Sequence, residues 1–260
     1  MRISPGWRNS ETAKANNPAR GNFPGRGRKL KASAIIVAAG SGVRLGSGVP
    51  KAFVKIGGRT MLSYSLGAVA QVNSIGEVVI TVPEGFESAA RAEAAAAGLG
   101  VPVKITPGGS ERQDSVRIAL GLTSSESELV IIHDAARPLA TPAIFQACLE
   151  AAERAGGAIA AIPVADTLKR VADSDSAITA TVARTGLWQA QTPQAFRRDL
   201  LVAAHRRAVS DAVVATDDAD LVERTGVRVE VVLGSTANLK ITTPPDLAIV
   251  EAILAAHKPG

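Results

Sequence analysis

Two cationic side chains accompany a glycine-rich loop that follows an apolar segment. Residues 34–39 are apolar and predict a buried strand, and Gly40 and Gly42 come directly after it. Because glycine has no Cβ, backbone N–H groups in such a loop can approach a ligand closely and form an anion-binding concavity. Arg44 and Lys51 add fixed positive charge close by. These residue types predict a polyphosphate site at the carboxyl end of a strand.

Two common phosphate-binding loops do not match these residues. A P-loop requires a lysine followed by serine or threonine, whereas Lys51 is followed by Ala52. A dinucleotide-binding fingerprint requires its third glycine at the start of a helix, but Gly46 comes one residue too late and Pro50 interrupts any helix. For this loop alone, a glycine-rich surface loop with solvated cations remains an alternative.

The elements that position this loop alternate between strand and helix. The predicted strands are residues 33–39, 77–82, 103–106, 129–133, 157–163, 229–233 and 239–242, with a short extended segment at 53–56. The predicted helices are residues 61–70, 86–97, a helix that starts at Ser110, 142–155, 196–208, 217–225 and 243–257. This alternation predicts an α/β fold with a mostly parallel sheet flanked by helices on both faces.

Three candidate sites fall at the carboxyl ends of predicted strands, where ligands bind in sheets of this kind. They are the glycine loop, the turn at residues 108–109, and Asp134. Ser110 with Gln113 three residues later predicts a capping box, and the helix that it begins offers free N–H groups as a second anion or base site. The coincidence of three sites is stronger evidence than any one of them. Asp134 alone could simply accept hydrogen bonds from the backbone of a neighbouring loop.

Residues 167–171 and 178–182 predict a β-hairpin that interrupts the strand–helix alternation. We therefore expect an arm, at about residues 164–186, that leaves the body of the protein. Basic side chains flank this arm, Arg184 among them, and their spacing alone is equally compatible with solvated surface charge.

Composition separates the first 31 residues from the rest. They contain eight Lys or Arg and one acidic residue, whereas the remainder contains 21 basic and 23 acidic side chains. This predicts a disordered basic tail at residues 1–31 and a single domain at 32–260. We expect no nucleic-acid binding, because the domain has no basic stripe and few aromatic residues. We also expect no membrane association, because no apolar run approaches about 20 residues.

The cysteine and histidine residues point away from several chemistries. Cys148 is the only cysteine, so no internal disulfide is possible, which fits a reducing, cytoplasmic compartment. His133 ends a buried strand and is interpreted as structural, and His205 and His257 as helix-surface residues. No general base is needed if the nucleophile is already an anion such as a phosphate oxygen.

Several longer motifs occur in order along most of the chain. They are residues 38–44 with 50–51, 108–116, 133–138, 166–169, 184–188 with 191–194, 216–218 and 238–242. Together they resemble the 2-C-methyl-D-erythritol 4-phosphate cytidylyltransferase family from about residue 33 to 256. The opening motif alone marks many nucleotidyltransferases, whereas residues 133–138 and 186–194 together are much more specific.

The resemblance implies a Rossmann-like nucleotidyltransferase fold with a protruding β-arm. It implies transfer of CMP from CTP to 2-C-methyl-D-erythritol 4-phosphate, which gives 4-diphosphocytidyl-2-C-methyl-D-erythritol and pyrophosphate in non-mevalonate isoprenoid biosynthesis. It also implies Mg²⁺, held mainly by the CTP phosphates, and a homodimer formed through the arm.

The resemblance further implies roles for individual residues. Arg44 and Lys51 would stabilise the charged, pentacoordinate phosphorus. Arg184 and Lys240 would hold the methylerythritol phosphate and direct its oxygen at the α-phosphorus. Residues implied to bind CTP or line the substrate pocket are Ala38, Ala39, Gly40, Gly42, Gly109, Arg112, Ser115, Asp134, Ala135, Arg137, Thr192 and Thr216. Thr167 and Arg184 would serve the partner's site across the dimer.

Two alternatives and two departures accompany this resemblance. A ribitol 5-phosphate cytidylyltransferase shares many of these motifs, although Arg184 and residues 238–242 favour the isoprenoid enzyme. A catalytically inactive nucleotide-binding homologue is an alternative of another class, and the intact cations argue against it. Ser110 stands where the family often has an acidic residue, and the basic tail is not part of the family's pattern.

Overall fold

The computed structural model describes residues 31–42, 45–46, 48–173 and 175–256. The predicted tail at residues 1–31 lies outside the described residues except for Lys31, and so does Arg44 of the glycine loop. Within the described ranges, no helix has both the length and the apolar character needed to cross a lipid bilayer.

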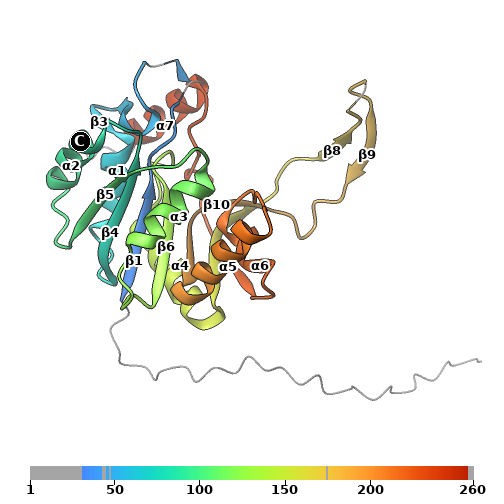
Figure 1. The fold of residues 1–260 in the computed structure, drawn as a ribbon. Helices are drawn as coiled ribbons and strands as arrows, with labels where there is room; N and C mark the ends of the chain where they lie inside the picture. Colours follow the sequence, from blue (N-terminus) through green and yellow to red (C-terminus); the bar gives the residue numbers. More distant parts are fainter. Residues whose placement is uncertain (1–30, 43–44, 47, 174, 257–260) are drawn as a thin grey trace, which may run out of the picture.

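A seven-stranded sheet forms the centre of the protein, in the order β11-β7-β10-β6-β1-β4-β5 (Figure 1). The strands are β1 (Ala32–Val37), β4 (Ile75–Val82), β5 (Val103–Pro107), β6 (Leu129–Asp134), β7 (Gly157–Pro163), β10 (Trp188–Arg197) and β11 (Val229–Leu233). Neighbouring strands are parallel, except that β10 runs antiparallel to β6 and β7. The predicted mostly parallel sheet is confirmed.

Helices cover both faces of this sheet. On one face lie α1 (Met61–Val69), α2 (Glu87–Ala96) and α4 (Pro142–Ala155), and on the other α3 (Arg112–Leu122), α5 (Arg198–Ser210) and α6 (Asp218–Glu223). Successive side chains of β1 point to opposite faces of the sheet. Ile36 packs in the core with α1, α2 and α4, and Ile35 packs in the core with α3, α5 and α6. A strand buried on both faces reads as a continuous apolar run, which is why β1 was predictable.

A third, smaller core lies beside the glycine loop. The buried Val250 of α7 (Pro244–Ala256) packs there with Ile56 and Met61. Ile56 belongs to a two-stranded sheet of β2 (Lys55–Ile56) and β3 (Arg59–Thr60). This core fixes the chain that follows Lys51 against the rest of the body.

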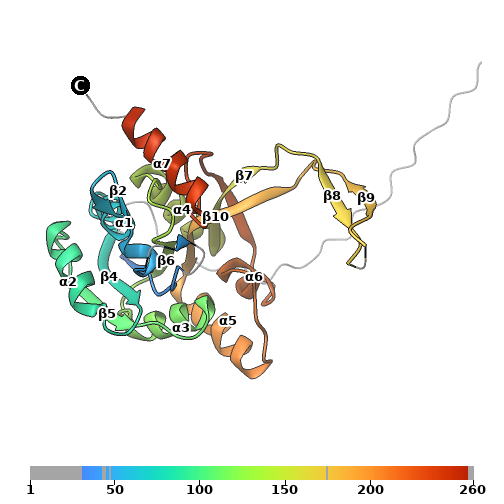
Figure 2. The ribbon, with the colours of Figure 1, turned by 90° about the horizontal axis from the view of Figure 1, so that it is seen from above.

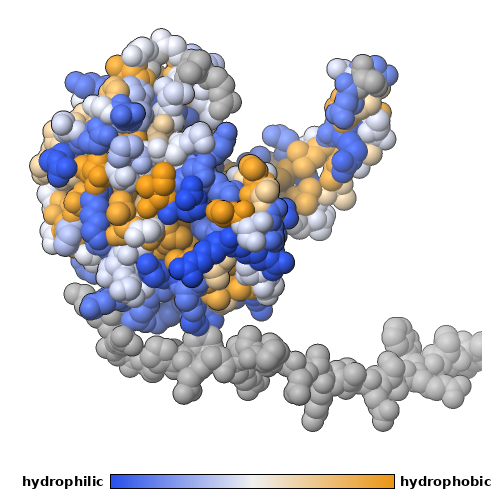
Figure 3. Space-filling model, viewed as in Figure 1, coloured by the Kyte–Doolittle hydropathy of each residue, from blue (hydrophilic) through white to orange (hydrophobic). Residues whose placement is uncertain are grey.

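The predicted hairpin is confirmed. β8 (Leu168–Val171) and β9 (Ile178–Val182) pair antiparallel as a separate two-stranded sheet. Figures 1 and 2 both show this arm extending away from the body beyond β7 and β10. The arm stands clear of the body in the space-filling view (Figure 3), and Val171, Ile178 and Trp188 are exposed along it or at its base. Exposed apolar side chains of this kind are typical of a surface that contacts another chain.

One central strand was not predicted. The expected helix at residues 196–208 begins only at Arg198, because Trp188–Arg197 form β10. The strand contains Gln191 and Gln194, so it does not read as an apolar run. Both glutamines are nevertheless buried and hydrogen-bonded, from Gln191 Nε2 to the Ser235 carbonyl at 2.9 Å and from Gln194 Nε2 to Asp217 at 2.8 Å.

Three smaller predictions were wrong. Residues 239–242 do not form a strand, since the segment is irregular and attached through the Ile241 N–H to the Ala136 carbonyl at 2.9 Å. Phe53 is not extended, because it ends a short 3-10 helix, η2 (Lys51–Phe53). His205 is not a surface residue, because α5 turns it inward and buries it against α6. The remaining predicted strands and helices are present within a few residues of their expected ends.

Candidate functional site

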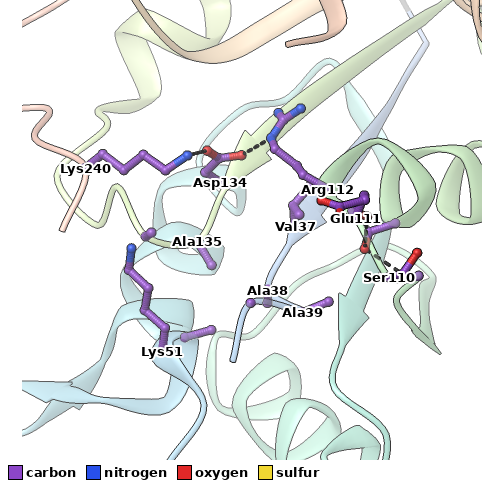
Figure 4. A pocket seen from close by; sticks show the side chains of 15 residues that line it. Val37, Ala38, Ala39, Lys51, Ser110, Glu111, Arg112, Asp134, Ala135 and Lys240 are labelled. Carbon is purple, nitrogen blue, oxygen red and sulfur yellow. Dashed lines mark hydrogen bonds and ion pairs between the residues drawn. The ribbon is translucent and has the colours of Figure 1, made fainter. Parts of the chain in front are cut away.

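A pocket opens where β1, β5 and β6 end. Its described lining combines small uncharged residues with three cations and two carboxylates (Figure 4). The lining residues are Val37, Ala38, Ala39, Gly40, Lys51, Ala52, Gly109, Ser110, Glu111, Arg112, Ser115, Asp134, Ala135, Ala136 and Lys240. The glycine loop, the turn after β5 and Asp134 therefore meet at one edge of the sheet, as the sequence predicts.

Asp134 organises the charges of this pocket. Its Oδ1 accepts a hydrogen bond from Arg112 Nε at 2.9 Å, and its Oδ2 accepts one from Lys240 Nζ at 2.7 Å (Figure 4). Burial opposes the charge of this carboxylate, but the two cations outweigh burial and hold the pKa of Asp134 well below its usual value. Asp134 is therefore ionised at neutral pH and sets the positions of both cations.

A chain of hydrogen bonds behind Asp134 fixes the turn that follows β6. The Asp134 N–H donates to Thr192 Oγ1 at 3.0 Å, and the Thr192 Oγ1 lies 3.0 Å from His133 Nδ1. Because the Arg137 carbonyl can only accept, His133 Nε2 carries the ring proton and donates to it at 3.2 Å, which leaves Nδ1 to accept from the Thr192 hydroxyl. Burial lowers the pKa of His133 to about 4, which agrees with the neutral imidazole that this chain requires.

We expect stability to fall as the pH is lowered from 6.5 to about 5. The folded pKa of His133, about 4, lies below the value of 6.5 for an unperturbed histidine, so the unfolded state binds more protons in this window. The loss from this residue is at most about 1.4 kcal/mol per pH unit. Denaturant unfolding across this range should show a shallower dependence on pH for His133→Gln than for the wild type. Equal slopes for the two proteins would exclude His133 as the cause.

The turn between β5 and α3 requires glycine at two positions. A Cβ at Gly108 would lie 2.3 Å from the Cβ of Ala39, and one at Gly109 would lie 2.3 Å from the Cβ of Asp114. Contacts this short do not occur between real Cβ atoms, so only glycine lets the turn approach the end of β1. The buried Ser115 Oγ accepts from the Gly109 N–H at 3.1 Å and so holds the turn against α3.

The predicted capping box is wrong. α3 begins at Arg112 with Glu111 at its N-cap, and no side chain caps it. Ser110 Oγ donates instead to Asp114 at 3.0 Å. Because the helix begins later than predicted, Gln113 turns away from Ser110 and toward residues 213–215. Its Nε2 donates to the Val213 carbonyl at 3.1 Å, and its Oε1 accepts from the Ala215 N–H at 3.0 Å.

Lys51 enters the pocket from the short helix that ends the glycine loop. Gly42, with a φ of +71°, lies against the start of this helix, and a Cβ there would lie 2.9 Å from the Lys51 Cβ. Figure 4 shows the Lys51 side chain extending toward Ala135, into the space that Lys240 borders. The two lysines therefore present positive charge to the same part of the pocket.

An irregular segment fixes Lys240. The buried Asn238 donates from Nδ2 to the Thr192 carbonyl at 2.9 Å. Its own carbonyl accepts from an Arg137 guanidinium nitrogen at 2.7 Å. The segment is thus attached to β10 and to the loop after β6, which places Lys240 within reach of Asp134.

Several predicted site residues lie outside the described lining. Arg137 binds backbone carbonyls, Thr192 lies behind Asp134, and Thr216 is exposed in the loop before α6. Thr167 and Arg184 lie on the exposed arm, where Arg184 donates to the Ala165 carbonyl. The roles of these residues stay predictions.

Sequence reasoning gave no role to Asp218, which the structure places behind the pocket. Asp218 is buried, and its Oδ2 accepts from an Arg112 guanidinium nitrogen at 2.7 Å. The buried His205 lies beside it, with Nε2 3.3 Å from the Asp218 Oδ1. Residues 216–218 were noted as a motif, but a helix as short as α6 offers too little periodicity to show which of its acids faces inward.

Residues 32–256 match a model of the family described as 2-C-methyl-D-erythritol 4-phosphate cytidylyltransferase. Relatives with the same description include one from Deinococcus radiodurans, 46% identical over 230 residues that cover 88% of this chain and 92% of the relative. Another, from Syntrophus aciditrophicus, is 44% identical over 232 residues that cover 87% of this chain and 97% of the relative.

Solved structures are similar as well. The 2-C-methyl-D-erythritol 4-phosphate cytidylyltransferase of Thermus thermophilus has a TM-score of 0.72 at 36% identity, over 87% of this chain and 100% of that one. The 4-diphosphocytidyl-2C-methyl-D-erythritol synthase of Anaerococcus prevotii has a TM-score of 0.78 at 30% identity, over 87% and 97% of the two chains. The similarity thus covers most of this chain and nearly all of each solved one.

Proposed function

This chain belongs to the 2-C-methyl-D-erythritol 4-phosphate cytidylyltransferase family, and we propose that it carries out the family's reaction in the pocket at the carboxyl edge of its sheet. The reaction transfers CMP from CTP to 2-C-methyl-D-erythritol 4-phosphate, releases pyrophosphate, and belongs to the non-mevalonate isoprenoid pathway. The observation that carries the proposal is the meeting of three cations in one pocket, where Lys51 lines the wall and Arg112 and Lys240 hold an ionised carboxylate. Anchored cations suit a reaction between two phosphate-bearing substrates.

CTP is assigned to the glycine loop and the turn after β5. The small side chains of Ala38, Ala39 and Ser115 leave room for a nucleoside between the ends of β1 and α3, and Gly109 keeps the turn close. Lys51 is assigned to the charge that builds up on the α-phosphorus and its oxygens. The family's motif gives Arg44 the same task.

The acceptor phosphate is assigned to Lys240. One of its oxygens attacks the α-phosphorus, a new P–O bond forms, and the bond to pyrophosphate breaks. Because this oxygen is already anionic, no residue has to remove a proton from it. The neutral His133, whose ring nitrogens are both engaged away from the pocket, fits a mechanism without a base. The chain's contribution is then positioning and charge stabilisation.

We propose that Mg²⁺ enters with CTP. Both oxygens of Asp134 are engaged by cations, and Glu111, the other carboxylate of the described lining, is exposed at the N-cap of α3. These side chains suit a metal that is bound mainly through substrate phosphates, as Mg²⁺ usually is. When bound, the metal would neutralise part of the triphosphate charge.

We infer a cytoplasmic location. Cys148 is a free, buried thiol, and burial raises its pKa to about 12. A chain with a single unreactive cysteine has no disulfide to form, which fits a reducing compartment.

Release of pyrophosphate tests the proposed reaction and its acceptor. The purified protein should release pyrophosphate with CTP and methylerythritol phosphate, and far less with ATP or GTP or with ribitol 5-phosphate. Release with ribitol 5-phosphate but not with methylerythritol phosphate would transfer the assignment to the ribitol enzyme. No release with any acceptor would favour an inactive nucleotide-binding homologue.

We further propose a homodimer in which the arm of one chain completes the pocket of the other. Support comes from the exposed Val171 and Ile178 and from the position of Thr167 and Arg184 on an arm that leaves the body (Figure 2). In a closed two-fold dimer, the arm of each chain would contact the body of the other chain.

Mixed dimers test this arrangement. Lys51→Ala disables the body's part of a site and Arg184→Ala the arm's part, so each protein alone should be nearly inactive. After the two are unfolded together and refolded, activity should recover to about one quarter of the wild type, because half of the dimers are mixed and each has one intact site. Mixed dimers that form but stay inactive would show that each arm serves its own chain.

A further inference from the structure

Asp218 is a buried charge behind the pocket that the proposed mechanism does not use. It lies at the start of α6, and its two oxygens face different partners. Oδ2 accepts from Arg112 at 2.7 Å, and Oδ1 lies 3.3 Å from Nε2 of the buried His205. Arg112 in turn donates from Nε to the pocket carboxylate Asp134 at 2.9 Å. One guanidinium therefore bridges a carboxylate that lines the pocket and a carboxylate that does not.

We propose that Asp218 is a positioning residue, which aligns the Asp134 carboxylate and through it Lys240 by fixing the Arg112 guanidinium. The proposal rests on the proposed function, because it concerns the efficiency of that same reaction.

The geometry of Arg112 supports this role. A guanidinium offers its donors in a rigid planar fork, so a partner on one edge sets the direction of the other edge. Asp218 and Asp134 occupy different nitrogens of this fork. The position of Asp134 in turn determines that of Lys240, because the second oxygen of Asp134 accepts a hydrogen bond from Lys240 Nζ at 2.7 Å. The chain of contacts thus runs from the interior to the acceptor's assigned lysine.

Hydrogen bonds on both sides of Asp218 fix the position of its backbone. Gln113, the neighbour of Arg112 on α3, clamps residues 213–215 through the Val213 carbonyl and the Ala215 N–H. Asp217 caps α6 by accepting from the Asp220 N–H at 3.0 Å, and Gln194 of β10 donates to it at 2.8 Å. The two adjacent aspartates therefore have different roles. Asp217 attaches α6 to β10, and Asp218 binds Arg112.

Steady-state kinetics of Asp218→Asn test the proposal, with CTP and methylerythritol phosphate as substrates. We expect the KM for methylerythritol phosphate to rise about tenfold, because Lys240 loses its fixed position. A smaller folded fraction would lower the apparent kcat and leave KM unchanged, so the rise in KM separates positioning from instability. Asp220→Asn is the matched control, because Asp220 lies on the same helix and pairs with Arg224 at the surface, away from Arg112. It should leave both constants unchanged.

A double variant shows whether Asp218 acts through Arg112. In an Arg112→Met background, adding Asp218→Asn should change kcat/KM by less than about twofold, because the path is already broken. This comparison does not need the Asp218→Asn single variant, since the double variant leaves neither charge buried without its partner, and the Arg112→Met protein keeps His205 beside Asp218. Losses that multiply in the double variant, or an unchanged KM in a folded Asp218→Asn protein, would overturn the proposal. A wild type without activity would instead remove the proposed function.

Discussion

Replacement of Lys51 by alanine is expected to lower kcat by at least about 10³-fold. Lys51 is the described cation nearest to the glycine loop, and Figure 4 shows its side chain extending into the pocket beside Ala135. Catalysis of nucleotidyl transfer depends on charges that are already in place when negative charge develops at phosphorus, and single groups of this kind contribute about 10²–10⁵ in rate. Pyrophosphate release at saturating CTP and acceptor measures the loss directly.

Lys55→Ala is the matched control for this change. Lys55 lies four residues further along, is exposed on β2, and is absent from the pocket lining. It should keep wild-type kcat, and thermal unfolding of both variants should show an intact fold. A Lys51→Ala protein that is folded and retains more than about one tenth of wild-type kcat would refute the assignment of Lys51 to the reacting phosphate.

Replacement of Asp134 by asparagine is expected to lower kcat/KM by about 10²-fold or more. The substitution keeps the shape of the side chain but removes the charge that both Arg112 and Lys240 face. Removal of one partner from a buried, hydrogen-bonded charge pair costs about 2–5 kcal/mol, and the low end of that range applies here because the Lys240 side chain is 41% exposed. Arg112 keeps Asp218 as a partner, whereas Lys240 is released, so the KM for methylerythritol phosphate should rise most.

Asp211→Asn tests whether loss of any aspartate–arginine pair has this effect. Asp211 pairs with Arg207 at 3.2 Å on the surface of α5, where such pairs contribute little. It should change neither kcat/KM nor stability beyond experimental error. Comparable activities for the Asp134→Asn, Asp211→Asn and wild-type proteins would show that the charge of Asp134 is not needed for substrate binding or turnover.

The sequence was most informative where one local rule decided the structure. Apolar runs such as residues 129–133 identified strands that are buried on both faces, and the glycines at 108–109 identified a turn that excludes any Cβ. Because parallel strands share one carboxyl edge, the order of these elements was enough to predict that Lys51 and Asp134 face one pocket. The motifs then identified the family, which composition could not do.

The missed features share a physical cause, since each involves a polar side chain whose position depends on a partner far away in sequence. Gln191 and Gln194 lie in a central strand only because loops after β11 and before α6 satisfy their amides. Gln113 and Ser110 fit a local capping pattern, yet distant residues 213–215 determine where Gln113 points. Asp218 is buried between Arg112 and His205. Periodicity in the sequence cannot reveal such contacts before the fold is known.

A crystal structure of the protein with CTP alone is the most direct test of the assignment of CTP to this pocket. The triphosphate is expected within hydrogen-bonding distance of the backbone at Gly40 and Gly42 and of Lys51 Nζ, with the cytosine ring against Gly109 and Ser115. Nucleotide bound elsewhere, or bound with its phosphates pointing away from Lys51, would contradict the view that this edge of the sheet holds the reacting phosphorus.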